Sequence, residues 1–74
     1  MKPTETGLLI GNNIMFRLEC FKMSQKELCR RTGLPYNTVG NYVRGLCIPN
    51  AVNLKKMAMV FECTTDELLL GVLE

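Results

Sequence analysis

The 74-residue sequence has no histidine and no tryptophan, and it holds one serine and one aspartate. Histidine is the side chain most often used as a general acid or base, and its absence removes the usual partner of a serine or cysteine nucleophile. Ser24 and Asp66 both lie in helix-capping patterns, and no paired carboxylates are placed on facing elements. We therefore expect that the protein is not an enzyme.

Long hydrophobic runs are also missing. No apolar stretch approaches the roughly 20 residues that a membrane-spanning helix needs. The N-terminal sequence MKPTE lacks the basic-then-apolar order of a signal peptide. These features predict a cytoplasmic protein without membrane contact, in which residues 1–74 form a single small domain.

The four cysteines, Cys20, Cys29, Cys47 and Cys63, do not form a metal-binding pattern. No pair has the C-x2-4-C spacing of zinc sites, and there is no histidine to complete a ligand set. A disulfide framework is typical of secreted proteins, for which the sequence gives no sign. We expect reduced thiols that pack as small apolar side chains, with no metal and no cofactor.

Charge is distributed unevenly around a net value of +2. Residues 1–33 contain six Lys/Arg and three Glu, a balance of +3. Residues 34–74 contain three Lys/Arg and four acidic residues, a balance of −1. The N-terminal part of the chain is therefore the better candidate for contact with a polyanion.

Apolar periodicity and capping motifs predict a compact all-α domain without β-strands. The segments Ser24 to Glu27 and Thr64 to Glu67 both have the form of a capping box, which begins a helix. Gly33 is placed to end a helix in a left-handed turn. The predicted helices span about residues 8–22, 25–32, 35–44, 51–62 and 65–70.

The second and third predicted helices, joined by a short turn at Gly33, have the layout of a helix-turn-helix unit. In such units the second helix enters the major groove of DNA. The spacing by itself is weak support, because small helical domains commonly contain such a turn.

The residue pattern is more specific than the spacing. The segment SQKELCRRTGLPYNTVGNYVRG, followed by Pro49, resembles the phage repressor/Cro-like helix-turn-helix family of transcriptional regulators, also described as xenobiotic-response-element-like. The likeness begins at Ile10, Gly11 and Ile14 and extends over about residues 10–70 without a gap. It implies a five-helix, lambda-repressor-like domain that binds double-stranded DNA sequence-specifically, with repression as the expected role.

The resemblance also implies roles for individual residues. The positions that match the family's base-reading residues are Tyr36, Asn37, Thr38, Gly40 and Asn41. The positions expected near phosphates are Ser24, Gln25, Lys26 and Arg44. Chemically, an asparagine can pair with adenine through two hydrogen bonds, and a threonine methyl can contact the thymine methyl. Arg44 has a second interpretation, a favourable interaction with the C-terminal end of the helix dipole. Tyr36 has one as well, a hydrogen bond to a phosphate or stacking on a sugar, and Lys26 also fits a solvated surface residue.

Poor helix formers are concentrated in the third helix, where Val39 and Tyr42 are expected to face the core. A core-facing stripe would hold the helix in place and leave its outer face free for DNA. We expect Gly40 on this outer face, where the missing side chain would let the backbone approach the DNA closely.

Two departures from the family pattern are visible. Many members pair an arginine of the first helix with a glutamate of the third, whereas the matching residues here are Leu18 and Val43, which we expect to be in contact. The loop 46–48, Leu-Cys-Ile, is apolar where basic residues are common.

The C-terminal LLLGVLE has more apolar surface than the last helix needs, and the loop 46–48 is apolar as well. They favour a homodimer formed through the C-terminal helix and tail or through the loop, although the tail could equally pack onto its own core. The same residues leave an alternative function open, a protein-interaction module such as an antitoxin or anti-repressor.

Overall fold

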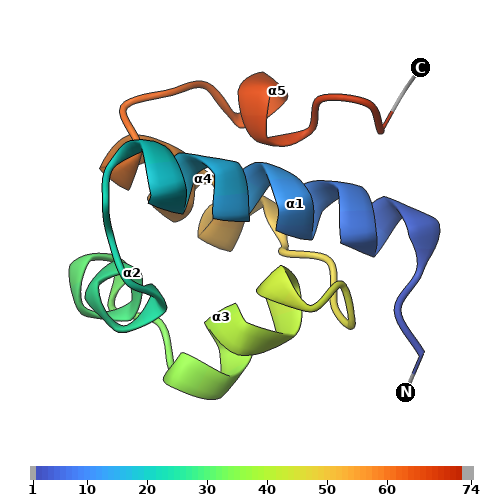
Figure 1. Ribbon diagram of the computed structural model, residues 1–74, viewed down its shortest axis with the longest axis horizontal. Coiled ribbons are helices and arrows are strands. Elements are labelled where there is room, and N and C mark those ends of the chain that lie inside the picture. Colours follow the sequence, from blue (N-terminus) through green and yellow to red (C-terminus); the bar gives the residue numbers. More distant parts are fainter. Residues whose placement is uncertain (1, 73–74) are drawn as a thin grey trace.

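The computed structural model describes residues 2–72, which form five α-helices. They are α1 (Glu5–Cys20), α2 (Gln25–Thr32), α3 (Tyr36–Val43), α4 (Ala51–Val60) and α5 (Thr65–Leu68). The longest helix, α1, crosses the molecule, with α5 on one side of it and α2 and α3 on the other (Figure 1). No strand occurs within residues 2–72, so the predicted all-α class is confirmed.

Helix ends differ from the sequence prediction in ways that local hydrogen bonds explain. The first helix begins at Glu5 and not at about residue 8, because the Thr4 hydroxyl accepts a hydrogen bond from the Gly7 amide (2.9 Å) and caps it. It ends at Cys20, two residues before a left-handed Lys22 with φ 52°. The fifth helix ends at Leu68, not at residue 70, and therefore has only four residues.

One of the two predicted capping boxes is complete and the other is half formed. The Thr64 hydroxyl and the Glu67 carboxylate exchange hydrogen bonds with each other's backbone amides. The Ser24 hydroxyl accepts from the Glu27 amide (3.1 Å), but the Glu27 side chain turns away to bind arginines. The predicted box at Ser24 is therefore wrong in its second half, because two charged guanidinium groups hold the Glu27 carboxylate.

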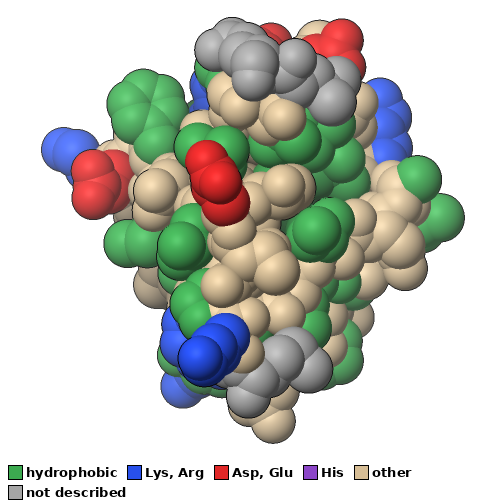
Figure 2. All heavy atoms as spheres, turned by 90° about the vertical axis from the view of Figure 1, so that its right-hand side faces the viewer, with side chains coloured by type: hydrophobic (Ala, Val, Ile, Leu, Met, Phe, Trp, Pro, Cys, Tyr) green, Lys and Arg blue, Asp and Glu red, His purple; other side chains and the backbone are tan. Residues whose placement is uncertain are grey.

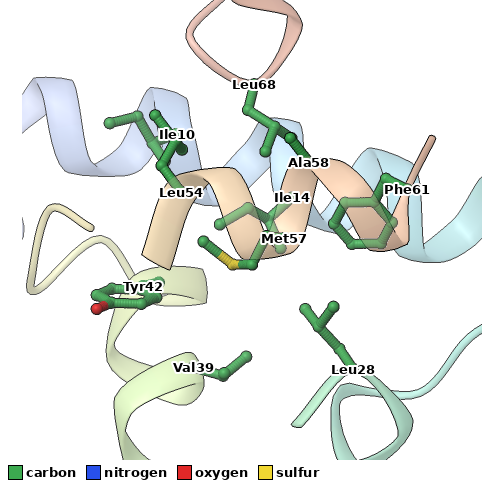
Figure 3. Packing of buried hydrophobic residues seen from close by; sticks show 10 residues of the cluster. All are labelled: Ile10, Ile14, Leu28, Val39, Tyr42, Leu54, Met57, Ala58, Phe61 and Leu68. Atoms are coloured by element: carbon green, nitrogen blue, oxygen red, sulfur yellow. The ribbon is translucent and has the colours of Figure 1, made fainter. Parts of the chain in front are cut away.

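The core contains side chains from all five helices (Figure 3). Its buried members are Ile10, Ile14, Leu28, Val39, Tyr42, Leu54, Met57, Ala58, Phe61 and Leu68. Leu18 and Val43 are partly buried and both pack against this cluster, while their direct contact stays a prediction.

Two glycines let α1 approach the end of α3 closely. A Cβ atom on Gly11 would lie 2.5 Å from the carbonyl oxygen of Val43, and one on Gly7 would collide with the carbonyl of Gly45. Real Cβ atoms essentially never make contacts below 3.0 Å, so only glycine fits at these two positions without a shift of the backbone. This close approach places α3 relative to the rest of the domain.

The C-terminal segment is held against α1 by side chains. The Asn13 amide donates hydrogen bonds to the carbonyl oxygens of Leu68 (2.9 Å) and Leu70 (3.0 Å). Arg17 and Glu67 form an ion pair at 2.7 Å. Leu69 and Val72 of the tail therefore pack on their own chain, whereas Leu70 is exposed. Leu73, part of the apolar tail noted in the sequence, lies outside the described residues.

Candidate nucleic-acid interface

Helices α2 and α3 meet through a turn whose geometry the sequence encodes locally. Gly33 ends α2 in the left-handed conformation (φ 76°), as predicted, and its amide donates to the Cys29 carbonyl. Pro35 occupies the N-cap position of α3 with φ −61° and makes no side-chain capping hydrogen bond. Both helices lie on the side of α1 opposite α5, so the acidic C-terminal helix is distant from this surface (Figure 1).

The two faces of α3 have different environments. Val39 is fully buried and Tyr42 is 6% exposed, as predicted for the core-facing stripe. The Tyr42 hydroxyl also accepts a hydrogen bond from the Asn53 amide (2.9 Å), which ties α3 to α4. Tyr36 and Asn37 are exposed, and Thr38 and Asn41 are partly buried. The apolar residues hold α3 in place, and the polar ones remain accessible to a ligand.

Gly40 is buried, and the expectation that it lies on the exposed face is wrong. A Cβ atom at this position would lie 3.1 Å from Nε2 of Gln25 and 3.2 Å from Nη1 of Arg44. Side chains from α2 and from the end of α3 therefore cover the glycine. Sequence reasoning missed this because the covering side chain of Gln25 comes from another helix.

The residues expected near phosphates surround the start of α2 and the end of α3. Ser24 and Lys26 are exposed, Gln25 is partly buried, and Arg44 is exposed at the C-cap of α3. Nη2 of Arg44 donates to Oδ1 of Asn41 (2.7 Å). This bond joins a predicted phosphate-contacting residue to a predicted base-reading residue, and the i,i+3 spacing on a helix was the signal that could have indicated it.

Glu27 neutralises part of the basic surface of α2. Its carboxylate accepts hydrogen bonds from Arg30 (3.0 Å to Nε) and Arg31 (2.7 Å to Nε). These bonds, with that of Arg30 the stronger influence, lower the pKa of Glu27 to about 2. Two of the basic residues in the N-terminal part of the chain are therefore engaged within α2 and contribute less positive potential than their number suggests.

The cysteines are separate free thiols. Burial raises the pKa of the Cys29 and Cys63 thiols. Within residues 2–72 no three Cys, Asp or Glu side chains are grouped so that they could hold a metal ion. None of the helices in this range is long and apolar enough to cross a membrane.

The geometry matches a family of known DNA-binding domains. The helix-turn-helix family model matches residues 17–68, and the chain belongs to this family, in its Cro/repressor type. The protein is accordingly a sequence-specific DNA-binding transcriptional regulator.

Its structure is similar to the crystal structure of the restriction-modification controller protein C.AhdI from Aeromonas hydrophila. The two share 26% sequence identity with a TM-score of 0.79, over 84% of this chain and 94% of that chain. A comparison with curated protein sequences gave no match. The family is described by its helix-turn-helix and the structural neighbour as a controller protein, and neither description names an enzymatic activity.

Proposed function

We propose that the protein is a repressor that inserts α3 into the major groove of its operator. The observation that carries this proposal is the division of α3 into a buried stripe, Val39 and Tyr42, and an accessible polar face. A helix fixed by its core-facing residues presents its outer side chains to the base edges in a constant orientation. The cytoplasm is the expected location, and we propose no catalytic activity.

We assign base contacts to Tyr36, Asn37, Thr38 and Asn41, which are the accessible polar residues of α3. Gly40, also expected to face the bases, is assigned the role of making room for the side chains that cover it.

Phosphate contacts are assigned to Ser24, Gln25, Lys26 and Arg44. The Ser24 hydroxyl oxygen already accepts the Glu27 amide, and its hydrogen remains free to donate to a phosphate. Only Lys26 and Arg44 in this set carry charge, so about two phosphates per subunit would be neutralised by direct ion pairing. The logarithm of affinity should then fall with the logarithm of salt concentration with a slope of about −2 per subunit.

We propose that the repressor binds as a homodimer, because regulators of this type use two-fold symmetric half-sites. Exposed apolar residues are available at both candidate surfaces, Leu70 in the C-terminal tail (58% exposed) and Ile48 in the 46–48 loop (55%). Hydrophobic side chains are exposed over much of the face at the right of Figure 1 (Figure 2). The mass of the particle in solution should fall from that of a dimer to that of a monomer in Leu70→Asp if the tail forms the interface. The same change is expected in Ile48→Asp if the loop forms it.

The decisive experiment is selection of bound sequences from a random duplex pool, followed by affinity measurements over a salt series. We expect an enriched palindrome, and we expect Asn37→Ala to relax the sequence preference more than it weakens binding to random DNA. A folded protein that enriches no sequence would refute the proposal.

The exposed Ile48 and Leu70 favour one alternative, a module that binds another protein, as antitoxins and anti-repressors do. In that case Asn37→Ala and Asn41→Ala would leave partner binding intact, whereas Ile48→Asp or Leu70→Asp would abolish it.

A further inference from the structure

The side chains of the two asparagines of α3, Asn37 and Asn41, differ in their hydrogen bonds. Oδ1 of Asn41 accepts a hydrogen bond from Arg44 (2.7 Å), whereas the exposed Asn37 side chain makes no hydrogen bond with other residues in 2–72. They lie four residues apart on one helix face and have the same side chain. They therefore form a matched pair in which one amide is held by a neighbour and the other is free.

The orientation of the Asn41 amide follows from the chemistry of its partner. A guanidinium group carries only donors, so the amide atom that faces it must be the oxygen. The Asn41 nitrogen is consequently on the opposite edge of the amide, with two hydrogens to donate. The lone pair left on Oδ1 lies beside a positive charge that repels the amino hydrogens of adenine or cytosine.

Gly40 permits this arrangement. The guanidinium of Arg44 lies over Gly40, where a Cβ atom would be 3.2 Å from Nη1, and Gln25 covers the other part of the same position. Because no side chain projects from Gly40, Arg44 can fold back along α3 to reach Asn41. The bond between Arg44 and Asn41 therefore depends on residues 40–44 of the chain and not on a neighbouring helix.

We propose that Arg44 is a specificity-determining positioning residue that turns Asn41 into a donor-only reader of bases. Arg44 keeps four of its five N–H groups, and Asn41 keeps its amide hydrogens, so the pair presents donors to the groove. Guanine is the base that offers two adjacent acceptors there, N7 and O6, whereas adenine offers an acceptor and a donor. Asn41 therefore selects guanine, and the free Asn37 retains the two-bond pairing with adenine. This inference rests on the proposed insertion of α3 into the major groove.

The test compares sequences selected from a random duplex pool by the wild type and by Asn41→Ala, Asn37→Ala and Arg44→Met. The two alanine variants identify which base pair each asparagine contacts, because the preference at that pair disappears. Methionine at position 44 keeps an unbranched side chain over Gly40 and removes every donor.

We expect guanine at the base pair contacted by Asn41 in the wild type. In Arg44→Met its enrichment over adenine should fall by about tenfold or more, the size of one good base contact. The preference at the Asn37 base pair should not change. In the free protein, Arg44→Met should shift the side-chain amide resonances of Asn41 and leave those of Asn37 in place, which checks the contact without DNA.

Several results would overturn the inference. Adenine at the Asn41 base pair in the wild type would mean that the Arg44 bond opens on binding. A uniform loss of affinity in Arg44→Met, with the guanine preference intact, is the behaviour of a phosphate contact alone. Side-chain amide resonances of Asn41 that do not shift in Arg44→Met would show that Arg44 does not bind Asn41 in the free protein. If the folded wild type enriches no sequence, the proposed function fails together with the inference, whereas an unchanged preference in Arg44→Met defeats the inference alone.

Discussion

Substitution of Gly40 by alanine should stabilise the fold and weaken DNA binding. Alanine is favoured over glycine by about 0.8–1.0 kcal/mol in a helix interior. The added Cβ would lie 3.1 Å from Gln25 Nε2 and 3.2 Å from Arg44 Nη1, both ends of flexible side chains that can move by a few tenths of an ångström. The free energy of unfolding should therefore rise by about 0.5–1 kcal/mol, which for a domain of this size raises Tm by about 2–8 °C.

The same movement should reduce affinity for DNA, because it displaces two side chains assigned to phosphate contacts. Urea unfolding followed by circular dichroism measures the stability, and fluorescence anisotropy with the selected operator measures the binding. A lower free energy of unfolding would show that Gln25 and Arg44 cannot move aside. Higher stability with unchanged affinity would show that their placement over Gly40 has no part in binding.

Gly11→Ala is the matched control, since it brings the same gain in helix propensity at a different site. Its Cβ would lie 2.5 Å from the Val43 carbonyl oxygen and 2.8 Å from that of Tyr42, and backbone atoms cannot rotate away. Overpacking of this kind costs about 1–3 kcal/mol. Set against the propensity gain of about 0.8–1.0 kcal/mol, this leaves a net fall in the free energy of unfolding of up to about 2 kcal/mol. Equal effects of the two substitutions would refute the reasoning.

Four further predictions concern charge and hydrogen bonding. The pKa of Glu27 is lowered from 4.5 to about 2, so its contribution to stability is complete above about pH 4.5 and is lost as pH falls toward 2. The difference in free energy of unfolding between wild type and Glu27→Gln should therefore disappear over that range, as measured by denaturation at several pH values. The same variant frees Arg30 and Arg31, and its salt slope of DNA binding should become steeper, whereas an unchanged slope would place both arginines away from the phosphates. Lys26→Met should make the slope shallower by about one unit. Asn13→Ala removes two hydrogen bonds to the C-terminal segment and should lower the free energy of unfolding by about 1–2 kcal/mol, with hydrogen exchange rising first in α5.

The helices and their order could be predicted because their signals are local. A cap such as Ser24, a stop such as Gly33 and the spacing of Val39 and Tyr42 act over three or four residues, which is the range of helix hydrogen bonds and of one helix face. The start of α1 was predicted wrongly because the apolar pattern begins after the Thr4 cap. The polar residues on the outer face of α3 could be predicted equally well, because they lie within one short segment of the chain.

By itself, then, the sequence determined the class of fold, the helix-turn-helix unit and the set of polar side chains on the third helix. The tertiary structure alone decided which positions of the helices are covered from a neighbouring helix. Gly40 is buried because Gln25 reaches it from α2, and α3 lies where it does because Gly11 admits the Val43 carbonyl. Such contacts depend on how helices pack, and one-dimensional spacing carries no information about the side chain that arrives from a neighbouring helix.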